Sequence, residues 1–209
     1  MKKVGILAAF SALFSCVWLF ALIHLSEVEK GFKPSESIIT LVEKTKDEVL
    51  YERQIEALGE EIAFHAHRLS KKYDMPAEVV CALVQTESDG INGRVSSANC
   101  VGLTQVSGAA VEQYNRVNGT SWELMDCKDD AGLNLEVGLW YFNWCVRQVE
   151  GTKYKWQNAY LMFNVGYGYY KKFYYEWVNG RNPLNGKRYR ALERFNGKLN
   201  AASKFFEIS

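Results

Sequence analysis

The sequence lacks several features that would point to particular classes of protein. Its 209 residues contain 25 Lys and Arg against 24 Asp and Glu, and this formal net charge of +1 argues against binding nucleic acid over the whole surface. No Cys-x2-Cys pair occurs and the three histidines lie elsewhere, so we expect no zinc site, no other metal and no cofactor. The chain also has no internal repeat and no low-complexity tract.

What is present is enough apolar sequence for a folded core. Hydrophobic residues make up 48% of the chain and charged residues 23%, which excludes global disorder. The length suits one medium-sized domain plus an appendage. The charge is uneven, since nine Lys or Arg and only three Glu occur from residue 171 onward. Such a basic end is typical of a solvated surface, or of one that attracts an anionic polymer such as the cell wall or lipid headgroups.

An apolar stretch covers residues 4–25, directly after two lysines. About 20 apolar residues span a bilayer, and lysines before such a span predict that the N-terminus stays inside. No clear small-x-small cleavage site occurs near its end. We therefore expect residues 1–25 to form an uncleaved inner-membrane anchor, with the rest of the chain in the periplasm or otherwise outside the membrane. A cleaved export signal is the alternative, and residues 13–16 resemble a lipoprotein box only faintly.

The remaining sequence predicts a mainly α-helical protein. Residues 26–57 have apolar positions at helical spacing among charges of both signs, and we expect a stem that is either a spacer helix or packs back on the domain. A domain should follow over residues 58–178, and then a basic extension over 179–209 that is loosely structured apart from a helix near 189–199. Small, turn-forming residues at 90–105 indicate a loop with a short β-hairpin. Helices are expected in the domain at residues 60–73, 76–87, 107–117, 131–149, 156–165 and 168–178.

Five cysteines are present, one of them in the expected anchor. The other four permit two disulfides in an oxidising compartment, and the sequence alone leaves three pairings open. We expect Cys100 to pair with Cys127, which would attach the glycine-containing loop to the segment before the next helix. Cys81 would then pair with Cys145 and join two helices. Four buried free thiols are the alternative.

Glu87 is the strongest candidate for a catalytic residue. It follows the apolar run at residues 79–84 and comes just before a turn at Asp89-Gly90. Partial burial and the negative end of a helix dipole both raise the pKa of a carboxyl group there. An acid that is still protonated near neutral pH is what cleavage of a glycosidic bond requires. Most glycosidases use two carboxylates, but Asp89 would face away from Glu87 on a helix and is interpreted as a turn residue.

Three further sequence blocks accompany Glu87 in a particular order. Ser96 precedes a Gly-Leu-x-Gln run at the spacing Ser-x5-Gly-Leu-x-Gln. An Asn at 134 and a Gly at 138 then lie on an expected helix, and Phe163-Asn164 follows. In this order and approximate spacing the blocks resemble the soluble-lytic-transglycosylase-like (SLT) domain over roughly residues 58–175. That family has a goose-lysozyme-like fold and cleaves peptidoglycan.

The resemblance implies a lytic transglycosylase that acts on peptidoglycan glycan strands with one Glu. The acid protonates the oxygen that bridges N-acetylmuramic acid and N-acetylglucosamine, and then accepts a proton from the muramoyl C6 hydroxyl. That hydroxyl attacks C1 and gives a 1,6-anhydro product without water, an intramolecular step favoured by proximity. The biological task could be local wall opening for a secretion or conjugation machine, or for phage entry or exit. A goose-type hydrolytic lysozyme and a non-catalytic wall-binding protein are the alternatives.

The same resemblance assigns roles to residues around Glu87. It implies that Ser96 and Gln105 line the cleft, where hydroxyl and amide groups bond the N-acetyl and hydroxyl groups of sugars. Gly102 would allow the backbone to approach the ligand closely. Asn164 would lie on the cleft wall. Asn134 is expected to be a helix-start or structural hydrogen-bonding residue rather than a substrate contact.

The sequence departs from the family pattern at three positions. Phe163 stands where the family usually has a Tyr that hydrogen-bonds near the catalytic acid, and Asn99 and Thr104 stand where Gly and Met are usual. Either Tyr160 or Tyr167 then supplies the missing hydroxyl, or the assistance is absent. Aromatic faces also stack on sugar rings, and Tyr167 is the aromatic residue that we expect in the cleft.

Overall fold

The computed structural model of the chain describes residues 44–178 and 187–207. The expected anchor at residues 1–25, and the stem up to residue 43, lie outside the described residues. None of the helices in the two described ranges combines the length and the hydropathy that crossing a bilayer requires.

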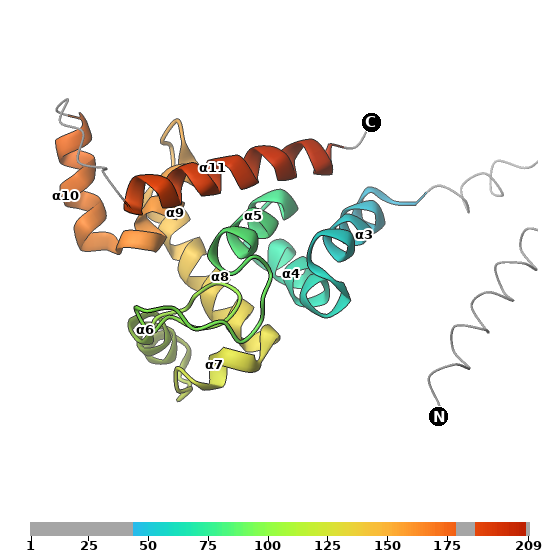
Figure 1. Ribbon diagram of the computed structural model, residues 1–209, viewed down its shortest axis with the longest axis horizontal. Helices are drawn as coiled ribbons and strands as arrows, with labels where there is room; N and C mark the ends of the chain where they lie inside the picture. Colours follow the sequence, from blue (N-terminus) through green and yellow to red (C-terminus); the bar gives the residue numbers. More distant parts are fainter. Residues whose placement is uncertain (1–43, 179–186, 208–209) are drawn as a thin grey trace, which may run out of the picture. The chain divides into compact units, whose positions relative to one another are not determined.

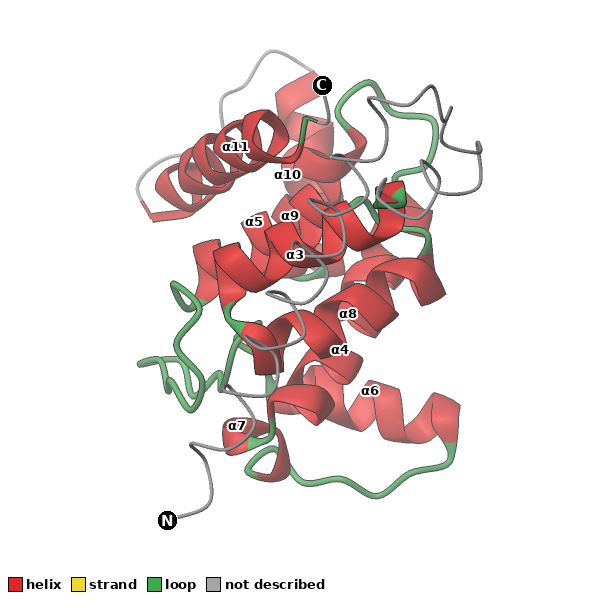
Figure 2. Ribbon diagram, turned by 90° about the vertical axis from the view of Figure 1, so that its right-hand side faces the viewer, coloured by secondary structure: helices red, strands yellow, loops and turns green. Residues whose placement is uncertain are grey.

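The described residues form helices joined by turns and loops, with no strand among them (Figure 2). This confirms the prediction of a mainly helical protein. The helices are α3 (Lys46–Leu58), α4 (Glu60–Tyr73), α5 (Ala77–Glu87), α6 (Gly108–Asn118), α7 (Asp126–Asp129), α8 (Ala131–Gln148), α9 (Lys155–Val165), α10 (Tyr167–Val178) and α11 (Lys187–Phe206) (Figure 1).

Local sequence signals set several helix boundaries. Pro76 directly precedes α5, and its fixed φ of −55° suits the entry to a helix. The side chain of Ser107 accepts a hydrogen bond from the Ala110 backbone amide at 3.3 Å and caps α6. Asp130 caps α8 in the same way, because its Oδ1 accepts from the Leu133 amide at 2.8 Å. These caps explain why the boundaries predicted for α5, α6 and α8 agree with the structure to within two residues.

Helix α5 lies at the centre of the fold. It packs against α3, α4 and α11, while α8 packs against α4, α6, α7 and α9. Val80, Leu83 and Val84 of α5 are completely buried in the main core. Full burial of an aliphatic side chain contributes roughly 1.5–3 kcal/mol, so this helix is held rigidly up to the residue where it ends, Glu87.

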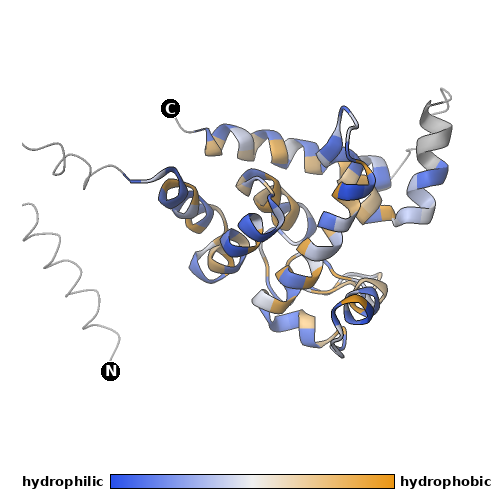
Figure 3. Cartoon of the chain, turned by 180° about the vertical axis from the view of Figure 1, so that it is seen from behind, coloured by the Kyte–Doolittle hydropathy of each residue, from blue (hydrophilic) through white to orange (hydrophobic). Residues whose placement is uncertain are grey.

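The C-terminal helix α11 corrects one prediction. Its segment was expected to be loosely structured with a helix near residues 189–199, whereas the helix runs from Lys187 to Phe206 and packs on α5 and α9 (Figure 1). Phe195, Leu199 and Phe206 are buried in the main core. Their spacing matches one face of a helix, but the many charges between them hid this apolar face, as the alternation along α11 in Figure 3 makes visible.

Helix α3 also packs on the domain, which was one of the two alternatives for the stem. Gln54 and Leu58 are buried, and the compact unit that includes α4 to α11 begins at Lys46. The Nη1 atom of Arg53 donates hydrogen bonds to the backbone oxygens of Phe205 and Glu207, the latter at 2.7 Å. The two ends of the described chain therefore support each other beside α5.

The loop after α5 forms no hairpin. Two isolated antiparallel bridges, Val95 with Val101 and Val101 with Val106, replace the strands that we expected. Beneath the loop the amide nitrogen of Asn134 donates to the backbone oxygens of Val101 at 2.9 Å and Cys127 at 2.8 Å. Its oxygen accepts from the backbone amide and the hydroxyl of Thr104, both at 2.9 Å. Asn134 is completely buried, so its role is structural, as predicted.

The disulfide prediction is wrong. Cys81, Cys100, Cys127 and Cys145 are all free thiols, and all but Cys100 are buried. Cys127 belongs to the small apolar cluster under the loop, whereas Cys100 lies in the loop itself with its side chain partly exposed. Cys81 and Cys145 pack within the main core, where burial raises the pKa of each thiol.

Candidate active site

A cavity of about 1020 Å³ opens beside the C-terminal end of α5. It is larger than most small-molecule pockets, which suits a polymeric ligand. The loop at residues 94–107, here called the loop wall, encloses one side. Residues 188–194 of α11, here called the helix wall, contribute to the lining from another element, and α8 and α9 complete it.

Five of the seven predicted site residues line this cavity. They are Glu87, Ser96, Gln105, Tyr160 and Asn164. They come from three separate parts of the chain, namely the end of α5, the loop wall and α9. The structure thus brings together residues that the sequence spreads over almost eighty positions.

Gly102 and Tyr167 do not line the cavity. Gly102 is buried with φ +73°, and a Cβ atom there would come within 2.0 Å of the Asn134 amide nitrogen. Its small size therefore serves the packing of the loop on Asn134 and not the approach of a ligand. Tyr167 begins α10 and packs edge-on against Trp144 with ring centroids 5.4 Å apart.

The Glu87 carboxyl group is held mostly in its protonated form up to neutral pH. Burial raises its pKa from 4.5 to about 7, against smaller opposing effects from the Tyr160 hydrogen bond and the charges of Arg194 and Arg94. The raised pKa that was expected from the apolar approach is present, with burial as its chief cause. A group with this pKa can give up and take back a proton near neutral pH.

Tyr160 supplies the phenol that is missing at position 163. Its hydroxyl donates to Oε1 of Glu87 at 2.9 Å, and the Asn164 side chain hydrogen-bonds the same phenol. Tyr160 and Phe163 lie three residues apart on α9, so they share one helix face and both line the cavity. A phenol placed one turn earlier on the helix can therefore reach the same acid.

The phenol is itself fixed by α11. The ring of Tyr160 stacks on Phe195 with centroids 4.2 Å apart and an interplanar angle of 3°, and both side chains are almost completely buried. Sequence reasoning missed Phe195, because nothing in the local pattern links it to a residue thirty-five positions earlier. The helical spacing of Phe195, Leu199 and Phe206 was the signal that could have placed this helix in the core.

Ser96 and Gln105 shape the loop wall from within. The Ser96 hydroxyl accepts a hydrogen bond from the Cys100 backbone amide at 3.1 Å. The Gln105 amide nitrogen donates to the backbone oxygens of Arg94 at 3.1 Å and Gly102 at 2.9 Å. Both side chains therefore hold the loop in position at the edge of the cavity.

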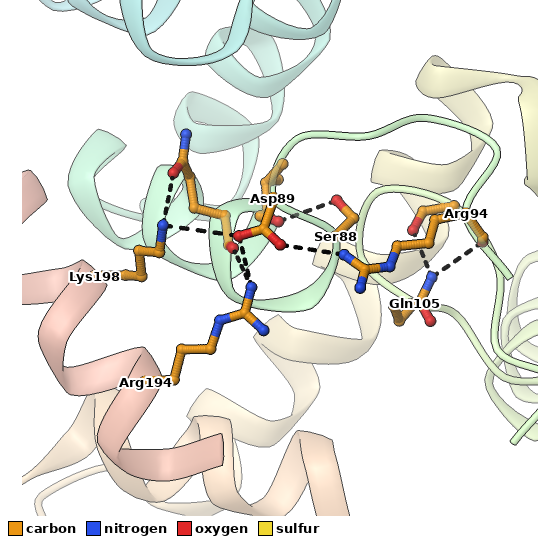
Figure 4. A network of polar contacts seen from close by, with 9 residues as sticks. Ser88, Asp89, Arg94, Gln105, Arg194 and Lys198 are labelled. Carbon is orange, nitrogen blue, oxygen red and sulfur yellow. Dashed lines mark hydrogen bonds and ion pairs between the residues drawn. The ribbon is translucent and has the colours of Figure 1, made fainter. Parts of the chain in front are cut away.

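Asp89 is a turn residue, as interpreted, and also the centre of an ion-pair network (Figure 4). It adopts the left-handed conformation with φ +58°. Its Oδ1 accepts from Nη2 of Arg194 at 2.6 Å and lies 3.8 Å from Nζ of Lys198, while its Oδ2 accepts from Nη1 of Arg94 at 3.2 Å. The hydrogen bond from Arg194 is the main cause that holds the pKa of Asp89 below its usual value. An ionised group paired in this way is no candidate for a second catalytic acid.

Comparison with protein families identifies a match over the central part of the chain. The family described as "Transglycosylase SLT domain" matches residues 65–175, just over half of the chain. The matched region contains Glu87, Ser96, Gln105, Tyr160 and Asn164, but not α3 or α11. No match was found among curated proteins.

Proposed function

Because this chain belongs to the transglycosylase SLT domain family, whose members act on peptidoglycan, we propose that it is a lytic transglycosylase with Glu87 as its only acid and base. The observation that carries the proposal is the environment of Glu87. Its carboxyl group has a pKa raised to about 7, accepts a hydrogen bond from Tyr160 and faces a large cavity. Among the described residues that line this cavity, Glu87 is the only Asp or Glu.

In the first step neutral Glu87 gives its proton to the oxygen between C1 of N-acetylmuramic acid and C4 of N-acetylglucosamine. The C1–O bond breaks, and N-acetylglucosamine leaves with the proton on its C4 hydroxyl. The 2-acetamido oxygen of the muramoyl residue stabilises the positive charge at C1. The Tyr160 hydroxyl and the charges of Arg94 and Arg194 stabilise the carboxylate that Glu87 becomes.

In the second step the Glu87 carboxylate accepts the proton of the muramoyl C6 hydroxyl. The C6 oxygen attacks C1 and closes the 1,6-anhydro ring, so the acid is restored and no water is consumed. The attacking hydroxyl belongs to the same sugar, which replaces a bimolecular reaction with an intramolecular one. This chemistry needs no second carboxylate, in agreement with the composition of the cavity lining.

Substrate contacts and location belong to the same proposal. Ser96, Gln105 and Asn164 line the cavity, which supports their proposed role in bonding the N-acetyl and hydroxyl groups of the glycan. Residues 1–25 would anchor the protein in the inner membrane with the domain on the periplasmic side. The alternative of a non-catalytic wall-binding protein rests on Phe163, which lacks the phenol that the family usually has there. The Tyr160 phenol weakens this alternative, because it donates a hydrogen bond to Glu87.

Mass spectrometry of the muropeptides that the full-length protein releases from purified sacculi tests this function. We expect 1,6-anhydromuramoyl ends, and a loss of at least about a thousandfold in their rate of release for Glu87→Gln, which keeps the shape of the neutral acid. Reducing muramoyl ends would instead identify a hydrolytic lysozyme. Protein that sediments with sacculi and releases nothing would be a wall-binding protein.

A further inference from the structure

The strongly basic and acidic side chains that line the cavity are mostly cationic. Arg94, Arg188 and Arg194 line it together with a single acid, Glu87, which is uncharged in the form that starts the reaction. Arg188 and Arg194 come from α11, which lies beyond the region matched by the family. The helix wall therefore adds positive charge to the cavity from outside the family's common domain.

Asp89 holds two of these arginines in fixed positions. Arg94 binds one carboxylate oxygen and Arg194 the other, so the two guanidinium groups lie on either side of it (Figure 4). Lys198 lies near the same carboxylate, and three cations thus share one anion. The network keeps net positive charge, and the protein's own hydrogen bonds orient its guanidinium groups.

The pair Arg94 and Arg194 still presents donors to the cavity. Each guanidinium has five N–H donors, while Asp89 engages Arg94 through Nη1 and Arg194 through Nη2. About two-fifths of each side chain is exposed, 41% for Arg94 and 42% for Arg194. Both charges lower the pKa of Glu87, so both act within electrostatic range of the reacting carboxyl group.

We propose that Arg94 and Arg194 form a carboxylate-binding subsite that recognises the acidic side chain of the muramoyl residue. The inference rests on the proposed function, because it identifies which part of the glycan this wall contacts. Peptidoglycan alternates a neutral sugar with one that carries a lactyl group, and the carboxylate is either that of the lactyl group itself or one on the attached peptide. Guanidinium groups bind carboxylates through paired, charge-assisted hydrogen bonds, which neutral N-acetylglucosamine cannot form.

Such a subsite determines which sugar of the glycan strand lies beside Glu87. With the acidic side chain on the arginine pair, the muramoyl C1 and not the glucosamine C1 is placed beside Glu87. Both sugars have a 2-acetamido group and a C6 hydroxyl, so the ring-closing chemistry alone does not distinguish the two glycosidic bonds. Recognition of the carboxylate therefore selects the bond that is cleaved.

Binding measurements in a Glu87→Gln background test the subsite without turnover. The ligands are muroglycan oligomers with peptides, the same oligomers after the peptides are removed, and chitin oligosaccharides of equal length, which have no carboxylate. Arg94→Gln and Arg194→Gln should each weaken binding of a carboxylate ligand about tenfold and change chitin binding less than about twofold. A loss confined to peptide-bearing oligomers assigns the carboxylate to the peptide, and a loss with the denuded oligomers assigns it to the lactyl group.

Lys198→Gln is the matched control. It removes one positive charge from the same helix and the same Asp89 network, but Lys198 does not line the cavity. It should leave the affinity for all three ligands within about twofold of the parent protein, since the charge of a partly exposed lysine outside the cavity is screened by solvent and salt. If Arg194→Gln loosens α11, Arg94→Gln decides between the outcomes, because Arg94 belongs to the loop wall and its side chain bonds only the exposed turn residue Asp89 across the network.

Two results would overturn the subsite. One is an equal loss of affinity for carboxylate ligands and for chitin, and the other is no loss for any ligand. Failure of the proposed function looks different, because it leaves anhydro products absent while the arginine variants still discriminate between acidic and neutral glycans.

Discussion

The two walls of the cavity are held by different forces. The loop wall rests on Asn134, whose hydrogen bonds are buried and neutral. The helix wall is held by the stack of Phe195 on Tyr160 and by the exposed ion pair of Arg194 with Asp89. Buried hydrogen bonds are costly to break and insensitive to salt, while exposed ion pairs contribute little to stability and respond to ionic strength. The loop wall is therefore the rigid part, and the helix wall is where charge can change at low cost in stability.

The largest effect should come from the support of the loop wall. Asn134→Ala removes four buried hydrogen bonds, leaves the Thr104 backbone amide without its partner and takes one donor from each of the backbone oxygens of Val101 and Cys127, so we expect a loss of about 5 kcal/mol in the free energy of unfolding. Denaturant titration measures it. Asn115→Ala is the matched control, because the hydrogen bonds of Asn115 with Trp122 are exposed and the one from the Thr120 hydroxyl is only partly buried; it should cost less than about 1 kcal/mol. Equal losses would mean that burial does not make the hydrogen bonds under the loop wall costly to break.

The apolar support of the helix wall comes next. Phe195→Ala opens a cavity beneath Tyr160, and we expect a loss of about 4 kcal/mol in the free energy of unfolding. Phe195→Leu keeps most of the volume and removes the stacking, so it should retain stability to within about 1.5 kcal/mol. The Leu variant should nevertheless lower kcat, because the Tyr160 ring is no longer fixed beside Glu87. An unchanged kcat in the Leu variant would show that α11 supports the fold without positioning the phenol.

Between the two walls lies Glu87, whose protonation should make the stability of the protein depend on pH. Its pKa is raised from 4.5 to about 7 in the folded protein, so the folded state binds the proton more tightly. The stability that this proton contributes is fully present below pH 4.5 and is lost as the pH rises through about 7. We therefore expect Glu87→Gln to become more stable than wild type by about 3 kcal/mol between pH 4 and pH 8.5. Thermal unfolding at several pH values measures the difference, and a constant difference would contradict burial of the carboxylate.

The smallest effect concerns the phenol. The Tyr160 hydrogen bond lowers the pKa of Glu87, so Tyr160→Phe should move the alkaline limb of the kcat profile to higher pH. It should also reduce kcat about tenfold, since the carboxylate loses one stabilising donor.

Adding Phe163→Tyr to Tyr160→Phe tests whether the lost activity is due to the missing phenol. It returns a phenol to the same face of α9, and we expect it to restore part of the lost activity. If Tyr160→Phe leaves both kcat and its pH profile unchanged, the hydrogen bond to Glu87 has no part in the reaction.

Much of the site could be predicted because its determinants are local. Glu87 ends an apolar helix and precedes a turn, and the consequence for its pKa follows from that pattern alone. The structural role of Asn134 and the turn at Asp89 were predicted on the same basis. The disulfides failed because the positions of cysteines in the sequence do not give the distance between their side chains in space.

The contacts of the helix wall could not be predicted, because they join distant parts of the chain. Asp89 and Arg194 are 105 positions apart, and their ion pair leaves no trace in local spacing. The basic composition of the C-terminal segment indicated a surface, although Phe195 and its neighbours on the same face belong to the core. A helix near residues 189–199 was expected, but the charged residues between its apolar ones concealed its length and the face that packs on the core.

The order of residues along the chain by itself determined the helical architecture, the candidate acid and the family. Helix periodicity, caps and the apolar approach to Glu87 act over a few residues, so they can be recognised without coordinates. Only the tertiary structure decided that Tyr160 and not Tyr167 reaches the acid, that four thiols stay free, and that α11 brings Phe195 and Arg194 to the cavity. Those outcomes depend on which faces pack together and on distances through space, and these are properties of the folded chain as a whole.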